Sequence, residues 1–332
     1  MRKRLACAAA AIVLLGMSAA YSFADELKEL NFGIISTEST QNLKTAWEPL
    51  LRDMEKSTGV KVKAFFAPDY AGVIEGMRFK KVDVAWYGNK SGMEAVDRAN
   101  GEVFAHTMSK DGDPGYWSLL IVPRDSPLNS LDDMLKHPGE LAFGNGDPNS
   151  TSGFLVPSYY VFAKNNIDPK TFFKRVVANN HETNALAVAN KLVDVATNNT
   201  EDLKRLQRTH PDKYAQIKII WKSPLIPRDP IVWRKDLPEE TKMKVKAFLL
   251  SYGRLGSNTK AELAVLEKLE MAPFVESNND QLIGTRQLTL FAQRSKIVND
   301  ANMPADEKKT KLREIDAKLH ELNQRMDQLA KN

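Results

Sequence analysis

The 332-residue sequence has one cysteine, Cys7, and five scattered histidines. Cys7 lies in an N-terminal segment that we expect to be removed, so the mature chain would contain no disulfide. Its stability would then rest on a hydrophobic core rather than on cross-links. No cluster of His, Cys, Asp and Glu has the spacing of a metal site. We therefore expect no metal and no other cofactor.

Motifs of common enzyme classes are also absent. The sequence has no Gly-x-Ser-x-Gly nucleophile turn, no phosphate-loop Gly-Lys-Ser/Thr and no His-Glu-x-x-His. Nothing pairs a nucleophile with an obvious base. We therefore expect a binding protein with no catalytic residue, rather than an enzyme.

Charge of one sign does not dominate either. The formal net charge is +5, and removing the three basic residues at positions 2–4 leaves +2. Acidic and basic residues are interspersed, and no long basic tract is present. Nucleic acid is therefore a poor candidate for a partner.

Residues 1–24 have the features of a secretory signal peptide. A basic head precedes an uncharged, mostly apolar run over residues 5–20, and Ser22-Phe23-Ala24 suits cleavage after Ala24. An uncleaved anchor is the alternative, but the run is shorter than the roughly 20 residues that a membrane-spanning helix needs. We expect an exported protein.

The mature chain alternates strand and helix patterns in two consecutive sets, which predicts an α/β fold with mostly parallel sheets. Val82-Asp83-Val84-Ala85 in the first set recurs as residues 193–196 in the second, which favours two similar lobes. Extended segments at 116–122 and 224–233 connect the sets and predict a hinge of two crossover strands. The expected divisions are a first lobe of residues 25–118 and 229–300, an inserted lobe of 119–228, and a C-terminal helix of 301–332.

The C-terminal helix carries apolar residues spaced alternately by three and four, which is a heptad seam. A helix that lies on its own domain would show the same amphipathic pattern. We favour a homodimer formed through this seam. Its members are Leu312, Ile315, Leu319, Leu322, Met326 and Leu329.

The segment 143–153 combines a strand end, a turn and three consecutive hydroxyl residues. We expect the glycines and Pro148 to end the strand, and Ser150, Thr151 and Ser152 to begin a helix. A helix N-terminus with free N–H groups and three hydroxyls suits a small tetrahedral oxyanion. The same residues would also serve as an ordinary helix cap, and Pro157 would disturb the helix start.

Other polar and aromatic residues follow predicted strands, where ligands of open α/β sheets bind. His181 suits an oxyanion, whereas Glu201 and Asp229 suit a cation, and Tyr116 suits the organic part between them. Simpler interpretations remain for most of them. His181 could cap a helix, Glu201 could complement a helix dipole, and the aromatic residues could belong to the core.

Several longer motifs resemble the periplasmic phosphonate-binding protein family of bacterial ABC transporters, over nearly the whole mature chain. Within that family, Asp-Pro-x-Ser-Thr-Ser-Gly also suits relatives that bind phosphite or other oxyanions. The motifs are Asn31-Phe32-Gly33-Ile34-Ile35-Ser36-Thr37-Glu38-Ser39, Phe65-Phe66-Ala67-Pro68-Asp69-Tyr70-Ala71-Gly72, the segment 144–153, His181-Glu182-Thr183-Asn184-Ala185, Ala196-Thr197-Asn198-Asn199-Thr200-Glu201 and Pro227-Arg228-Asp229-Pro230-Ile231-Val232-Trp233.

The resemblance implies a two-lobed periplasmic receptor that captures 2-aminoethylphosphonate-like compounds and delivers them to a membrane permease. It implies that the three hydroxyl residues and a histidine hold the phosphonate, that two tyrosines face the ligand, and that two acids face its amine. It also implies a dimer formed through C-terminal helices. The residues in this sequence are Ser150, Thr151, Ser152, His181, Tyr70, Tyr116, Glu201 and Asp229.

Three other functions remain open at this point. One is a receptor for phosphite, phosphate or a phosphate ester. A second is a secreted phosphatase or phosphonate hydrolase that would use His181 as nucleophile, although no base is paired with it. A third is a solute-binding sensor that docks on a receptor kinase instead of a permease.

Overall fold

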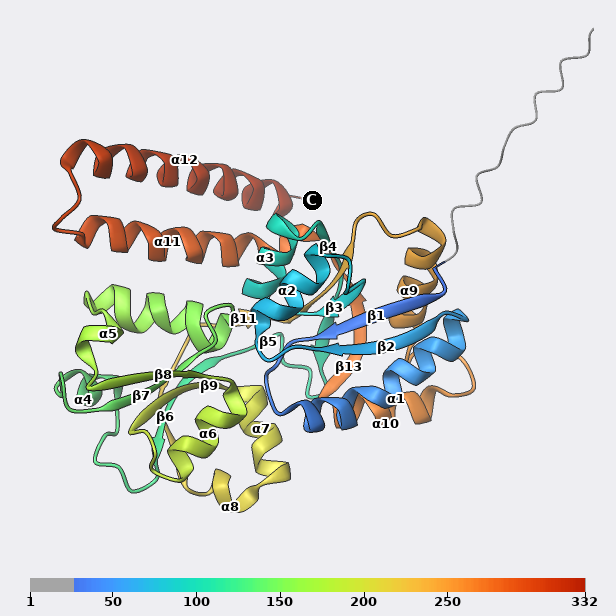
Figure 1. The fold of residues 1–332 in the computed structure, drawn as a ribbon, viewed down its shortest axis with the longest axis horizontal. Coiled ribbons are helices and arrows are strands. Elements are labelled where there is room, and N and C mark those ends of the chain that lie inside the picture. The colour runs from blue at the N-terminus through green and yellow to red at the C-terminus, as the bar shows by residue number, and fades with distance from the viewer. Residues whose placement is uncertain (1–26, 332) are drawn as a thin grey trace, which may run out of the picture.

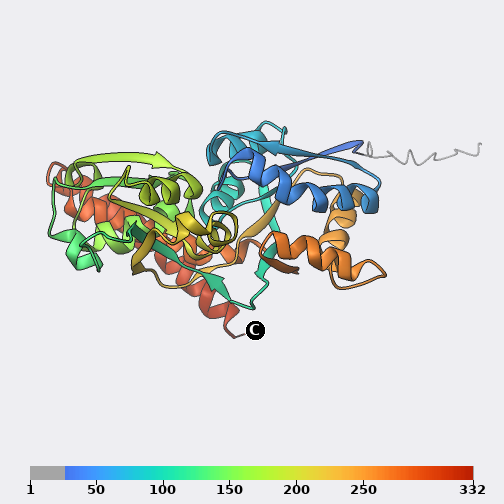
Figure 2. The same cartoon turned by 90° about the horizontal axis from the view of Figure 1, so that it is seen from below.

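The computed structural model describes residues 27–331, so the predicted signal peptide and Cys7 lie outside the described residues. Figure 1 shows two lobes side by side, each with a sheet flanked by helices, and two long antiparallel helices along one side. Figure 2 shows the lobes next to each other along the long axis. The predicted two-lobed α/β fold with a C-terminal helical extension is confirmed.

The first lobe is built on a six-stranded sheet of order β13-β4-β12-β3-β1-β2. β1 pairs in parallel with β2 and β3, whereas β12 and β13 pair antiparallel with their neighbours. The sheet is mixed, so the prediction of a mostly parallel sheet is wrong. The reason is that β12 and β13 join it after the chain returns from the second lobe. The strands are β1 (Glu29–Ile34), β2 (Lys61–Phe66), β3 (Val84–Trp86), β4 (Gly101–Ser109), β12 (Pro230–Arg234) and β13 (Met271–Glu276).

The second lobe is built on a five-stranded sheet of order β10-β6-β9-β7-β8. β7 is parallel to β8 and β9, and β6 is antiparallel to β9 and β10. The strands are β6 (Ser118–Pro123), β7 (Ala142–Gly146), β8 (Arg175–Asn179), β9 (Val195–Asn199) and β10 (Ile217–Lys222).

β7 continues through the glycines that were predicted to end it. A Cβ atom at Gly146 would collide with the backbone of Gly153, and one at Gly144 would lie 2.6 Å from Asn184 Oδ1. Glycine is therefore needed because other backbone and side-chain atoms approach the strand closely. This close approach brings the segment after β7 against the end of the sheet.

Two short strands lie where the chain passes between the lobes. β5 (Gly115–Tyr116) and β11 (Ile226–Pro227) pair antiparallel, with Tyr116 opposite Ile226. The predicted crossing segments, 116–122 and 224–233, overlap these strands and continue into β6 and into a strand of the first sheet, β12. The six-stranded sheet takes its strands from residues 29–109 and 230–276, and the five-stranded sheet takes its strands from 118–222. We keep the exact lobe boundaries as a proposal.

The helices of the first lobe pack on its sheet through an apolar face, as α1 shows. Its residues Trp47, Leu50, Leu51 and Met54 recur at helical spacing, and all are buried against the core. Gly59, with a φ of 72°, ends the helix in the left-handed conformation. The helices of this lobe are α1 (Thr40–Thr58), α2 (Tyr70–Arg78), α3 (Asn89–Arg98), α9 (Glu239–Ser251) and α10 (Thr259–Lys268).

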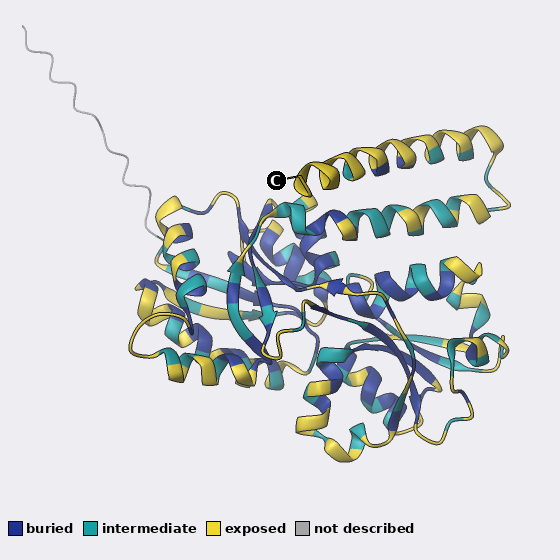
Figure 3. Ribbon diagram, turned by 180° about the vertical axis from the view of Figure 1, so that it is seen from behind, coloured by how far each residue is buried: buried dark blue, intermediate teal, exposed yellow. Residues whose placement is uncertain are grey.

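The second lobe carries apolar clusters on both faces of its sheet. Figure 3 shows the buried strands between more exposed helices in each lobe. The helices are α4 (Leu131–Leu135), α5 (Pro169–Phe172), α6 (His181–Ala189), α7 (Thr200–Thr209) and α8 (Pro211–Tyr214).

The segment after β7 is not the regular α-helix that was predicted from Ser152. It forms two wide π-helical turns, η1 (Thr151–Leu155) and η2 (Ser158–Phe162), followed by a tight 3-10 turn, η3 (Ala163–Asn165). The Leu155 N–H donates to Ser150 O at 3.1 Å, five residues back. Pro157 lies between the two wide turns and has no N–H to donate, so it interrupts the ladder.

The C-terminal helices form a hairpin in which α12 (Ala305–Leu329) packs on α11 (Ile283–Asn299), which follows the short turn η4 (Asn279–Leu282). Of the predicted seam, Ile315 and Leu319 are buried, whereas Met326 and Leu329 are 45% and 39% exposed. The outer face of α12 is exposed in Figure 3. Part of the seam therefore lies on the chain's own fold. Over residues 27–331, no helix combines the length and the apolar composition needed to cross a bilayer.

Candidate ligand-binding site

A cavity of about 300 Å³, including its open mouth, lies between the two lobes. The first lobe and the hinge contribute Tyr70 at the start of α2, Tyr116 on β5 and Asp229 just before β12. The second lobe contributes the other five predicted residues, so all eight are brought together. They are Tyr70, Tyr116, Ser150, Thr151, Ser152, His181, Glu201 and Asp229.

Ser150, Thr151 and Ser152 form a buried hydroxyl corner at the end of β7. Ser150 Oγ accepts the Gly153 N–H at 2.9 Å, so it does act as a helix cap. Thr151 Oγ1 accepts the Lys90 N–H of the first lobe at 2.8 Å, which leaves its hydroxyl proton free to donate. Hydroxyl donors beside the first turn of a helix suit an oxyanion.

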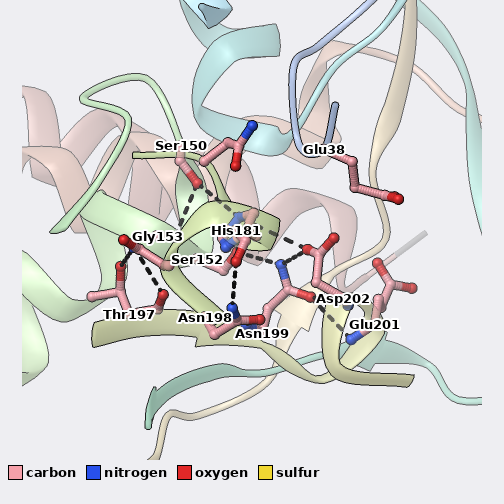
Figure 4. Close-up of polar contacts among 12 residues, drawn as sticks. Glu38, Ser150, Ser152, Gly153, His181, Thr197, Asn198, Asn199, Glu201 and Asp202 are labelled. Carbon is pink, nitrogen blue, oxygen red and sulfur yellow. Dashed lines mark hydrogen bonds and ion pairs between the residues drawn. The ribbon is translucent and has the colours of Figure 1, made fainter. Parts of the chain in front are cut away.

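His181 lies beside this hydroxyl corner. Its Nε2 is 3.4 Å from Ser150 Oγ and 3.5 Å from Ser152 Oγ (Figure 4). Burial lowers the pKa of His181, while the carboxylate of Asp202, 4.0 Å from Nε2, acts in the opposite direction. The residue that caps α6 is Asn180, whose side chain accepts the Thr183 N–H, so His181 is not the cap.

A buried network behind the hydroxyl corner was missed by sequence reasoning. Asn199 Nδ2 donates to Ser152 Oγ at 3.2 Å and to Asp202 Oδ2 at 2.5 Å (Figure 4). Arg205 Nη2 donates to the other oxygen of Asp202 at 2.7 Å. Asn199 belongs to the motif at 196–201, but no sequence signal indicated that its amide would face a serine 47 residues earlier.

Acidic groups lie elsewhere on the cavity wall. Asp229 Oδ1 accepts the Tyr116 hydroxyl at 3.0 Å. Burial raises the pKa of Asp229 to about 8, and the charge of Glu201 adds to the shift. Glu201 is paired with the guanidinium of Arg228. Within residues 27–331, Asp229 is therefore the cavity carboxyl without an ion pair, and the charge of Arg228 only partly opposes the rise of its pKa.

Aromatic residues form part of the wall. Tyr70 is buried, and burial raises its pKa well above the ordinary value, so its hydroxyl stays neutral and can donate. Its backbone N–H donates across the cleft to Asp147 Oδ2 at 3.2 Å. Trp86 also lines the cavity, although it was not assigned to the site. Trp117 does not line it, and the ammonium of Lys222 lies 3.8 Å from its ring centroid.

Several buried polar atoms along this cavity lack a hydrogen-bond partner in the described part of the chain. Three of them are Thr37 Oγ1, Trp86 Nε1 and His181 Nδ1, and each belongs to a residue that lines the cavity. The fourth, Arg205 Nε, forms an ion pair with Glu38. An unpaired buried polar group costs about 1–3 kcal/mol. A polar ligand that reached these atoms would remove that cost.

A larger and mostly apolar groove of about 950 Å³ lies between η2, the crossover segment and α11. Of the eight predicted residues only Thr151 borders it. Of these two, only the smaller cavity combines hydroxyls, a histidine and carboxyls, so we consider it the better candidate. Among residues 27–331, no group of three or more His, Cys, Asp and Glu is placed to hold a metal ion.

Comparison with known proteins identifies the family to which the chain is similar. Residues 32–282 match the family described as ABC transporter, phosphonate, periplasmic substrate-binding protein. The chain is 60% identical over 299 residues to the phosphonates-binding periplasmic protein of Escherichia coli K12, covering 90% of this chain and 87% of that protein.

Two further relatives complete the comparison. The crystal structure of a binding protein component of an ABC phosphonate transporter from Pseudomonas aeruginosa is similar, with a TM-score of 0.88 and 58% identity, covering 92% of this chain and 100% of that chain. The phosphate-import protein of Mycolicibacterium smegmatis is 31% identical over 242 residues, covering 67% of this chain and 74% of that protein.

Proposed function

The chain belongs to the family of periplasmic phosphonate-binding proteins of ABC transporters, and from that membership we propose that its ligand is an aminophosphonate of the 2-aminoethylphosphonate type. It is a periplasmic phosphonate-binding receptor of such a transporter. The observation that carries the finer proposal is one cavity with a hydroxyl corner and a buried carboxyl, Asp229, that forms no ion pair within residues 27–331.

The phosphonate group would occupy the hydroxyl corner. The hydroxyls of Thr151 and Ser152 and the first N–H groups of η1 would donate to its oxygens, as at other helix N-termini that bind anions. His181 would add a hydrogen bond from its ring. Because burial lowers the pKa of His181, we expect the neutral imidazole to make this contact unless the ligand's charge raises that pKa.

The amine of the ligand would lie near Asp229. An ammonium beside a buried carboxyl favours the charged form of that carboxyl, so it would oppose the effect of burial on Asp229. Glu201 is already paired with Arg228, so we expect it to act as a secondary charge rather than the main partner. Tyr70, Tyr116 and Trp86 would surround the carbon chain and the ammonium.

Closure of the lobes over the ligand would present the closed form to the permease. The described structure already joins the lobes through contacts such as that between Lys90 N and Thr151 Oγ1. A ligand shifts the protein toward this form only if it binds the closed form better than the open one. Ligand contacts from both lobes would provide that difference.

The proposal also includes assembly and export. The second half of the α12 seam, with Met326 and Leu329 exposed, would form a homodimer with a second copy. Removal of residues 1–24 would release the mature chain into the periplasm.

Calorimetric titration tests the ligand class. We expect the mature protein to bind 2-aminoethylphosphonate tightly and inorganic phosphate weakly at the same concentration. Preference for phosphate would contradict the aminophosphonate proposal, and would leave Asp229 without a role in recognition.

A receptor for phosphate, phosphite or a phosphate ester is the second candidate, favoured by the 31% identity to a phosphate-import protein. The affinity order of these anions in the same titration decides between the candidates. Incubation with a chromogenic phosphate ester tests the remaining hydrolase hypothesis, for which we expect no turnover.

A further inference from the structure

Glu182 belongs to a motif of the site but does not line the ligand cavity. Its neighbour His181 does line it, and Asn184 of the same motif binds carbonyls in the middle of β7 and β9 inside the second lobe. Glu182 instead reaches the first lobe. Its position next to a cavity residue makes it a candidate for coupling the ligand to lobe closure.

The contacts of Glu182 converge on the start of α1. Its Oε2 accepts the Ser39 N–H at 2.7 Å, and its Oε1 accepts Asn42 Nδ2 at 2.7 Å. Its backbone N–H donates to Thr37 O at 3.3 Å. Ser39 caps α1, so the carboxylate lies at the N-terminus of a 19-residue helix, where the helix dipole favours negative charge.

A second contact between the lobes lies beside the hydrogen bonds of Glu182. Glu38 of the first lobe pairs with Arg205 Nε of α7, and Arg205 in turn binds Asp202. Burial raises the pKa of Glu38, and the charge of Arg205 opposes that shift. The segment 37–42 is therefore held on the start of α6 and on Arg205 of α7, and its Thr37 also lines the ligand cavity.

We propose that Glu182 is a positioning residue that locks the closed form by binding the start of α1 across the cleft. All its contacts named above join residues 140 or more apart in sequence and in different lobes. They can form only when the lobes meet, so their free energy counts toward the closed, liganded form alone. The inference rests on ligand capture between the lobes, and it does not depend on which phosphonate is bound.

If Glu182 stabilises only the closed form, its substitution should change the dissociation rate of the ligand and not the association rate. A ligand enters the open protein, in which Glu182 is not engaged, so substitution should leave the association rate unchanged. Dissociation requires the lobes to separate, so losing the lock should accelerate it. A glutamine at position 182 keeps one oxygen acceptor, so it loses the charge and one of the two hydrogen bonds. Loss of one hydrogen bond to a charged group corresponds to about a tenfold increase in the dissociation rate.

Glu182→Gln tests the inference, because it keeps the shape of the side chain and removes its charge. Stopped-flow binding would use 2-aminoethylphosphonate or methylphosphonate, whichever binds the wild type more tightly. We expect about tenfold faster dissociation, association within about twofold, and an unchanged Tm of the protein without ligand. Glu140→Gln is the matched control, because Glu140 contacts His137 inside the second lobe.

Asn42→Ala provides an independent check from the other lobe. We expect it to accelerate dissociation too, and the double variant with Glu182→Gln to show less than the product of the two effects, as for residues in direct contact. An unchanged dissociation rate in Glu182→Gln would overturn the proposal. So would a lower Tm of the ligand-free variant, because it would show that Glu182 stabilises the fold in general rather than the closed form. A wild type that prefers methylphosphonate would contradict the aminophosphonate proposal alone and leave this test intact.

Discussion

Asp229→Asn should separate aminophosphonates from phosphonates without an amine. With an ammonium in the cavity, Asp229 is a carboxylate that pairs with it, and asparagine replaces that pair with a neutral contact. A hydrogen bond to a charged group contributes about 1.5–3 kcal/mol, so binding of 2-aminoethylphosphonate should weaken about 10- to 150-fold. The Tyr116 hydroxyl can still donate to the oxygen of asparagine, so the cavity wall should be preserved.

Methylphosphonate should respond differently. It brings no cation, and the pKa of about 8 means that Asp229 is mostly protonated at pH 7 when the lobes are closed. Asparagine resembles this neutral acid in shape and polarity. We therefore expect the affinity for methylphosphonate to change by less than about threefold, a small effect on the scale of hydrogen-bond energies.

The pH dependence provides a second assay of the same reasoning. In the open form, water should return the pKa of Asp229 toward about 3.9, whereas in the closed form burial holds it near 8. Closure over methylphosphonate then takes up a proton between these values, so affinity should fall as the pH rises from 6 to 8. The limit is about tenfold per pH unit. An ammonium ligand should abolish most of this fall.

Calorimetry at pH 6, 7 and 8 on the wild type and Asp229→Asn would measure both effects. The titration of the ligand itself is common to the two proteins and cancels in their ratio. Equal losses of affinity for the two ligands in Asp229→Asn would refute the assignment of Asp229 to the amine. The same pH dependence of methylphosphonate binding in both proteins would refute the role of its raised pKa.

Three further outcomes follow from the structure. Gly88→Ala would place a Cβ 3.1 Å from Thr151 Oγ1 and so hinder the approach of the two lobes. Calorimetry should show about tenfold weaker binding of every phosphonate at unchanged Tm, and unchanged affinity would contradict this. Asn184→Ala removes the side-chain amide that donates to the buried carbonyls of Gly144 and Thr197. It should lower the free energy of unfolding, measured in urea, by about 1–3 kcal/mol, and an unchanged urea midpoint would contradict this. A chain truncated at about Met303 should sediment as a monomer and the full mature chain as a dimer, and equal masses would exclude assembly through α12.

The positions of the site residues relative to the strands could be predicted from local sequence. Ser150 follows β7, His181 follows β8, and Glu201 follows β9, and these parallel strands end at the same edge of one sheet. Polar residues placed after such strands must therefore come close together. This geometric rule, together with the motifs of the family, was enough to select eight residues that line one cavity.

Other elements were missed because their partners are distant in sequence. β13 was not predicted, and it contains Pro273, which argues against a central strand. The structure places β13 at the edge of its sheet, paired with β4 more than 150 residues earlier, where a missing N–H is tolerated. The strand forms because it pairs with β4, and the local sequence contains no information about that pairing.

The charges of the site illustrate the same limit. Glu201 and Asp229 look equivalent in sequence, as two acids that follow predicted elements. In the structure Arg228 pairs with Glu201, while burial raises the pKa of Asp229, whose side-chain partner within residues 27–331 is the Tyr116 hydroxyl. Their difference depends on burial and on neighbours from other elements, and pKa shifts come from both.

By itself, the sequence determined the alternation of strands and helices, the residue types at the strand ends and the two extended crossings. These depend on periodicity and on short-range steric rules, which act within a few residues. The tertiary structure decided which of the two acids is paired with an arginine, why Gly146 must be a glycine, and that Glu182 faces the other lobe. Those outcomes depend on distances between atoms far apart along the chain, and only the folded arrangement sets such distances.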